Sequence, residues 1–204
     1  GKSFAGKREL VNVFLATKDR IIILDPMGEY SPLVRQFGRD GLVVEIAPNS
    51  PHHINPMELD ISIDDDVSPI SLKCDFLLSL MELIVGGKDG LQPVERTIID
   101  RCSRMVYRDY LNDPEHAPMP TLQDLYDLLC RQKELETARL ATALEIYVSG
   151  SLNIFNHKTD VDYKNARVVC FDLKKLGAGL RTIAMHILND LTNSQVSYNF
   201  AHHI

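Results

Sequence analysis

The fold prediction starts from residues 1–29, whose sequence is GKSFAGKRELVNVFLATKDRIIILDPMGE. Gly1, Lys2 and Ser3 match the end of the phosphate-binding motif G-x-x-x-x-G-K-[ST], known as Walker A. In that motif backbone N–H groups cradle a phosphate, the lysine reaches the β and γ oxygens, and the hydroxyl binds Mg²⁺. The predicted nucleotide-binding residues are therefore Gly1, Lys2, Ser3 and Phe4, with Ser3 as the metal ligand and Lys2 in a catalytic role.

The residues after this motif predict a helix and then a buried strand. The helix spans residues 3–16, and its apolar face is expected to consist of Phe4, Leu10, Val11, Phe14 and Leu15. The apolar run 21–24 opens into the acidic turn 25–29, as is typical of a parallel strand. A three-residue match also occurs by chance, so the alternative is an exposed N-terminus before a surface helix.

The rest of the chain predicts a sheet interrupted by helices. Further strands are expected at 42–46 and 166–171, and a helical pattern fills most of the interval between them. Ser31 is expected to cap a short helix, and Thr121 with Asp124 a longer one. The predicted fold class is α/β: a partial parallel sheet in segments 1–63 and 151–204, with an all-helical insertion over 64–150.

Composition restricts the class of protein. The 204 residues are 45% hydrophobic and 25% charged, with a net charge of -6. The mean hydropathy is -0.10 and the pI is about 5.6. These values indicate a soluble globular protein and argue against a nucleic-acid-binding surface over the whole chain, although a local basic groove stays open. No run approaches the roughly 20 apolar residues of a membrane span, and no signal peptide opens the chain.

Metal-binding patterns are weak. The four cysteines are widely spaced, which favours reduced thiols over a zinc site or a disulfide framework. His52-His53 and His202-His203 are adjacent pairs without the i, i+4 spacing of helical ligands. The acidic run 64–66 is expected to be a solvated loop.

Several short stretches, taken in order, resemble one family. They are GKSF at 1–4 followed by KRE at 7–9, DPMGEY at 25–30, INPM at 54–57, SGSLNIFNHKT at 149–159 and FDLKKLG at 171–177. Together they are similar to the VirB/TraC-like ATPases of conjugation and type IV secretion, in the HerA–FtsK clade of P-loop NTPases. The stretches span most of the chain, and their joint order is more specific than the Walker motif alone.

This resemblance implies a RecA-like P-loop ATPase that uses ATP and Mg²⁺. It further implies a homo-oligomeric ring, often a hexamer, at the cytoplasmic face of the membrane. The implied partners are other inner-membrane components of the secretion channel and DNA. Alternatives are a DNA-translocating coupling protein of the same clade, with a basic pore, and a non-catalytic helical interaction module.

The acids that would complete such a site are only partly present. Asp25 and Asp172 each end an apolar run, but neither is followed directly by glutamate. The resemblance implies an Asp-Glu pair on a later strand, which we expect beyond Ile204, so the isolated chain is expected to hydrolyse ATP poorly. Glu29 is the second predicted catalytic residue, in a water-orienting or subunit-contact role, with turn stabilisation as the alternative.

Two other polar features are candidates for contacts with nucleotide or a neighbouring subunit. Asn156, Lys158 and Thr159 form a polar cluster, for which a capped loop is an equal explanation. Arg181 is one of several arginines that a ring could use across a subunit interface.

Overall fold

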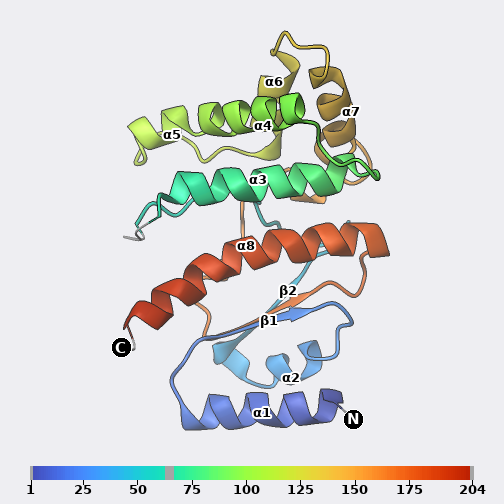
Figure 1. The fold of residues 1–204 in the computed structure, drawn as a ribbon. Coiled ribbons are helices and arrows are strands. Elements are labelled where there is room, and N and C mark those ends of the chain that lie inside the picture. The colour runs from blue at the N-terminus through green and yellow to red at the C-terminus, as the bar shows by residue number, and fades with distance from the viewer. Residues whose placement is uncertain (1, 63–66, 203–204) are drawn as a thin grey trace. The chain divides into compact units, whose positions relative to one another are not determined.

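The computed structural model describes residues 2–62 and 67–202, with residues 194–202 described as backbone only. Figure 1 shows the strands and helices of the described residues, and in chain order the longest run of helices falls between the second and third strands. The described residues form two compact units. The first comprises residues up to His53 together with Thr159–Met185, and the second comprises Ile54–Lys158 and the chain from His186 onward.

The first unit is built on a parallel sheet. Strands β1 (Ile21–Asp25), β2 (Gly41–Glu45) and β3 (Val168–Asp172) are arranged in the order β1-β3-β2, and both pairings are parallel. Residues 168–171 of the central strand are fully buried, as expected for a strand covered on both faces. The chain leaves the sheet after β2 and returns to its centre more than 120 residues later.

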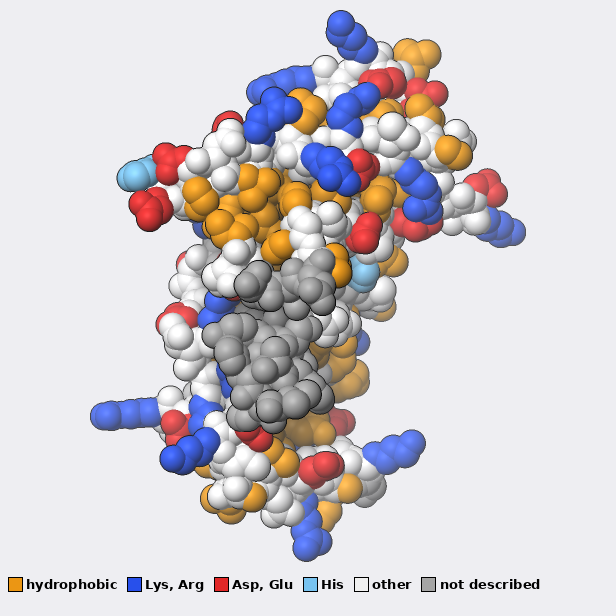
Figure 2. All heavy atoms as spheres, turned by 60° about the vertical axis from the view of Figure 1, so that its left-hand side comes forward, with side chains coloured by type: hydrophobic (Ala, Val, Ile, Leu, Met, Phe, Trp, Pro, Cys, Tyr) orange, Lys and Arg blue, Asp and Glu red, His pale blue; other side chains and the backbone are white. Residues whose placement is uncertain are grey.

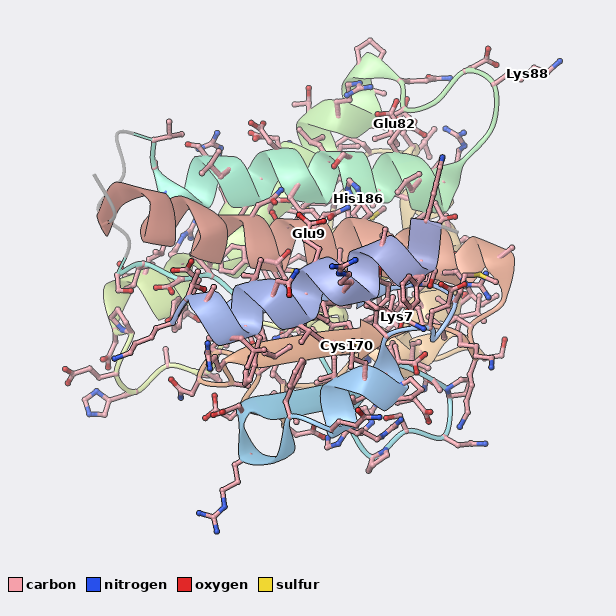
Figure 3. The ribbon with its side chains drawn as sticks, turned by 90° about the horizontal axis from the view of Figure 1, so that it is seen from below. Lys7, Glu9, Glu82, Lys88, Cys170 and His186 are labelled. Atoms are coloured by element: carbon pink, nitrogen blue, oxygen red, sulfur yellow. The ribbon has the colours of Figure 1, made fainter. Side chains whose placement is uncertain are left out.

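Helices α1 (Lys2–Ala16) and α2 (Ser31–Arg35) also belong to this unit. Phe14 of α1 packs on a core cluster of Val34, Val168 and Cys170 and stacks on Phe37 with ring centroids 4.2 Å apart. Figure 3 looks onto the side of the sheet that α1 covers, with Lys7 and Glu9 on the helix and Cys170 on β3.

Within the described residues the second unit is helical and contains no strand. Its elements are α3 (Pro69–Val85), α4 (Pro93–Val106), α5 (Arg108–Asn112), α6 (Leu122–Cys130), α7 (Thr137–Val148) and the later part of α8 (Ala178–His202). Thr121 and Asp124 form a capping box at the start of α6, as predicted. Apolar side chains also gather on one face of the part built by α3 to α5 (Figure 2).

Two buried charged side chains of this unit, Glu95 and Lys73, are paired. Glu95, 2% exposed, accepts from the Gln92 N–H at 2.8 Å and from Arg139 Nη1 at 2.7 and 2.8 Å. Lys73 Nζ lies 2.5 Å from Asp190 Oδ2 and joins α3 to the later part of α8. Such contacts fix the register of the helices, since an unpaired buried charge is strongly unfavourable.

The predicted α/β fold class is confirmed: a parallel sheet carries an inserted helical segment. The division at residues 63 and 150 stays a prediction, and the acidic run 64–66 lies outside the described residues. Beyond Asn193 the backbone continues α8 as far as His202.

Some details of the predicted helices were wrong. Phe4 and Leu15, both expected on the apolar face of the first helix, are 74% and 75% exposed. At about 100° per residue, Phe4 and Leu15 lie roughly 120–140° around α1 from the buried Leu10, both on the same side, and so away from the face that meets the sheet. The cap of α2 is Tyr30, and Ser31 is already helical.

Candidate functional site

The N-terminal end of α1 lies at the carboxyl edge of the sheet. The helix precedes β1, and its first turns reach the turn that follows β1: a Cβ on Gly6 would overlap the Tyr30 hydroxyl oxygen. Lys2 and Ser3 begin the helix about one turn before Gly6. In open parallel α/β sheets this edge is where ligands bind, and free N–H groups at a helix N-terminus favour an anion.

The predicted phosphate-binding residues are accessible. Lys2 and Phe4 are exposed and Ser3 is half-buried, while Gly1 lies outside the described residues. An exposed ammonium, a hydroxyl and unpaired helical N–H groups form a donor set that suits the phosphates of a magnesium nucleotide. The sequence motif and the position of the helix end therefore agree.

A buried carboxylate shapes the turn after β1. Asp25 is 2% exposed, and its two oxygens accept the N–H groups of Glu29 at 3.0 Å and Tyr30 at 2.8 Å. Glu29 itself is exposed at the surface of this turn. Asp25 therefore acts as a turn former, and Glu29 is presented to solvent at the same edge as the start of α1.

Asp172, at the end of β3, supports the same turn from the other side. Its Oδ2 accepts the Ser31 hydroxyl at 2.6 Å, and its Oδ1 accepts the Lys174 N–H at 3.0 Å. Gly28 has φ +69°, and a Cβ there would lie 2.9 Å from Lys174 Cδ. Both the backbone conformation and the lack of space thus require glycine at residue 28.

Cys170 lies between these two acids. Its Sγ is 3.7 Å from both the Asp25 Oδ2 and the Ser31 hydroxyl oxygen. Burial, together with the two neighbouring carboxylates, raises the pKa of the Cys170 thiol to about 12. The thiol is therefore neutral near pH 7 and is not a nucleophile.

This environment predicts a specific order of thiol alkylation. Cys130 is exposed, whereas Cys74, Cys102 and Cys170 are buried. In the native protein at pH 7.5, one equivalent of N-ethylmaleimide is expected to enter at Cys130, and the other three thiols are expected to react only in denaturant. Mass spectrometry of proteolytic fragments measures this order, and early labelling of Cys170 would contradict the packing at the ends of β1 and β3.

The other predicted candidates have mainly structural contacts. Asn156 Oδ1 accepts the Gln123 N–H at 2.9 Å, and its Nδ2 donates to the Val148 carbonyl at 3.0 Å, which favours the capped-loop explanation. Lys158 is exposed, and Thr159 belongs to the first unit whereas Asn156 belongs to the second. Arg181 Nη2 donates to the Leu176 carbonyl at 2.8 Å.

Among residues 2–62 and 67–202, no three His, Cys, Asp or Glu side chains are grouped in a way that could hold a metal ion. His53 Nδ1 lies 2.5 Å from Asp160 Oδ2. Desolvation by itself would raise the pKa of Asp160, but hydrogen bonds from the His53 ring and N–H outweigh it, and the pKa is lowered. His53 thus forms a hydrogen bond with the Asp160 carboxylate. His203 lies outside the described residues.

Two contacts of this region were missed by sequence reasoning. One joins Ser31 to Asp172 over 141 residues of sequence, and the other places Tyr30 against Gly6. A glycine inside a helix costs about 1 kcal/mol relative to alanine, so Gly6 was a signal that something approaches α1 closely.

The parallel sheet and the inserted helices define a class of fold: a partial RecA-like sheet interrupted by a helical segment. No protein-family model and no curated protein matches the chain. Among solved structures, VirB4 of Thermoanaerobacter pseudethanolicus matches with a TM-score of 0.79 and 20% sequence identity, over 97% of this chain and 76% of that one. The chain thus has a VirB4-like fold.

Within the part of the chain that the structure describes, no helix is both long and apolar enough to cross a membrane.

Proposed function

We propose that this chain is part of an ATP-hydrolysing motor subunit that energises a conjugative type IV secretion channel. The observation that carries the proposal is the position of Lys2 and Ser3, at the start of a helix whose first turns meet the carboxyl edge of a parallel sheet. The VirB4-like fold supports the same assignment.

The residues divide the chemistry among them. The Lys2 ammonium stabilises negative charge on the β and γ phosphates, and the N–H groups at the start of α1 hold the phosphate in place. The Ser3 hydroxyl would hold Mg²⁺, and the metal would neutralise phosphate charge. Glu29 orients the attacking water or contacts a neighbouring subunit, in a position fixed by the Asp25 carboxylate.

Asp25 and Asp172 are not assigned as magnesium ligands. Each carboxylate already accepts protein hydrogen bonds on both oxygens. The Asp-Glu pair that would complete the ATPase site is assigned to a later strand. The motor subunit is assigned to a hexameric ring at the cytoplasmic face of the membrane. Its partners are other inner-membrane components of the channel and the transferred DNA or protein.

Binding of a magnesium nucleotide is the direct test. At about 100 times its Kd, a ligand that binds only the folded state adds about 2.7 kcal/mol of stability. For a domain of this size that corresponds to a rise of roughly 5–10 °C in melting temperature. We expect MgATP to give such a rise in a calorimetric melt and EDTA to remove most of it. Equal melting with and without MgATP at millimolar concentration would contradict the proposed function.

A further inference from the structure

Tyr30 lies against α1 at a residue where only glycine leaves room for it. The nearest atom to an added Cβ at Gly6 is the Tyr30 hydroxyl oxygen, closer than real Cβ contacts allow, and the next is the ring Cζ at 3.6 Å. Without the hydroxyl, an alanine at residue 6 would therefore be in ordinary van der Waals contact with the ring. The hydroxyl of Tyr30 occupies the space that a side chain would take.

Tyr30 cannot simply move away from α1. Its N–H donates to the buried Asp25 carboxylate at 2.8 Å, and its ring packs against the core cluster that includes Val168 and Cys170. The next residue, Ser31, donates its hydroxyl to Asp172 at 2.6 Å. The turn is thus attached to the ends of both β1 and β3, and Tyr30 extends from it to the first turns of α1.

We propose that Tyr30 is a positioning residue for phosphate binding, and that it acts by contacting α1 at Gly6. By fixing the distance between the first turns of α1 and the turn of Glu29, Tyr30 sets where Lys2 and Ser3 meet the nucleotide. This inference rests on the proposed function, and it assigns to Tyr30 a role that acts through Lys2 and Ser3. A displacement of about 1 Å in such a site is sufficient to cost on the order of a hundredfold in rate.

A double-mutant cycle tests the proposal. The proteins are wild type, Gly6→Ala, Tyr30→Phe and Gly6→Ala/Tyr30→Phe, and the probe is MgATP, with its Kd measured by isothermal titration calorimetry and the melting temperature recorded in parallel. Gly6→Ala is expected to weaken MgATP binding about tenfold, within the range of coupling seen for contacting residues. The double variant is expected to bind within about threefold of Tyr30→Phe alone, because a ring without the hydroxyl leaves space for the new methyl group.

Gly179→Ala is the matched control. Gly179 lies in the first turn of α8, and a Cβ there meets no atom within 4 Å. It is expected to bind MgATP within about twofold of wild type, since the substitution adds the same methyl group to a helix without a neighbour.

The possible failures are distinguishable. Wild-type affinity in Gly6→Ala, or a loss that Tyr30→Phe does not restore, would overturn the positioning role. A lower melting temperature of Gly6→Ala with an unchanged Kd for MgATP would show that Tyr30 has only a structural role, and this result would also overturn the positioning role. If wild type itself does not bind MgATP, the proposed function fails, and the positioning role fails with it.

Discussion

Lys2→Ala in the intact protein is expected to reduce ATP hydrolysis by about 10²–10³-fold while leaving the fold in place. The ammonium meets phosphate oxygens whose charge redistributes during transfer, and removing one preorganised contact of this kind typically has an effect of that size. The side chain is exposed at the start of α1, so the free energy of unfolding is expected to change by no more than about 0.5 kcal/mol. Steady-state hydrolysis and thermal melting, measured side by side, check both statements.

Two further variants make this result specific. Lys18→Ala removes the same charge from an exposed residue just beyond the other end of α1, and it is expected to hydrolyse ATP at the wild-type rate. Lys2→Arg is not expected to restore activity, because a planar guanidinium does not occupy the compact position of an ammonium. Unchanged hydrolysis and unchanged melting in Lys2→Ala would show that the Gly-Lys-Ser match is accidental.

Asp25→Ala is expected to have the largest effect on stability among the residues of the candidate site. The carboxylate is 2% exposed and accepts two backbone N–H groups, so its removal leaves two donors of the turn without their partner. At about 1–3 kcal/mol for each buried unsatisfied group, the free energy of unfolding is expected to fall by about 3 kcal/mol. Urea denaturation followed by circular dichroism measures this change.

Asp25→Asn separates the hydrogen bonds from the charge. An asparagine oxygen accepts one of the two N–H groups in nearly the same place, so about half of the loss is expected. If Asp25→Ala and Asp25→Asn were both as stable as wild type, the turn would not depend on this carboxylate, and the placement of Glu29 and Tyr30 would need another explanation.

The strands and most of the helices were predictable from local patterns. The apolar runs ending at Asp25 and Asp172 are strands, and Thr121 caps a helix, because each of these features depends on neighbours in sequence. The strand order β1-β3-β2 depends on how the chain returns after the helical segment, and no local pattern encodes it. The exposure of Phe4 and Leu15 was missed because a broad apolar stripe does not reveal which part of it meets the sheet.

The sequence motifs of the candidate site were predictable, but the contacts between its distant residues were not. Lys2, Ser3 and Glu29 were identified from short stretches, and their catalytic and binding roles stay predictions. The hydrogen bond between Ser31 and Asp172 was hidden because a serine followed by proline is a typical helix start, and its partner lies 141 residues away. The acids at both strand ends were already disfavoured as magnesium ligands because neither is followed by glutamate, and their backbone and hydroxyl donors could not be predicted from the sequence.

Backbone amide NMR during a titration with MgATP shows residue by residue whether nucleotide binds at the start of α1. A 23.0 kDa protein is small enough for this measurement on a deuterated, ¹⁵N-labelled sample. We predict that the N–H resonances of residues 2–6 and 28–30 shift together and reach saturation, whereas those of α4 and α6 do not shift. The Lys2→Ala protein is expected to show much smaller shifts at the same MgATP concentration. Saturable shifts confined to the second unit, or none at residues 2–6 with MgATP in excess, would contradict the claim that the start of α1 binds nucleotide phosphates.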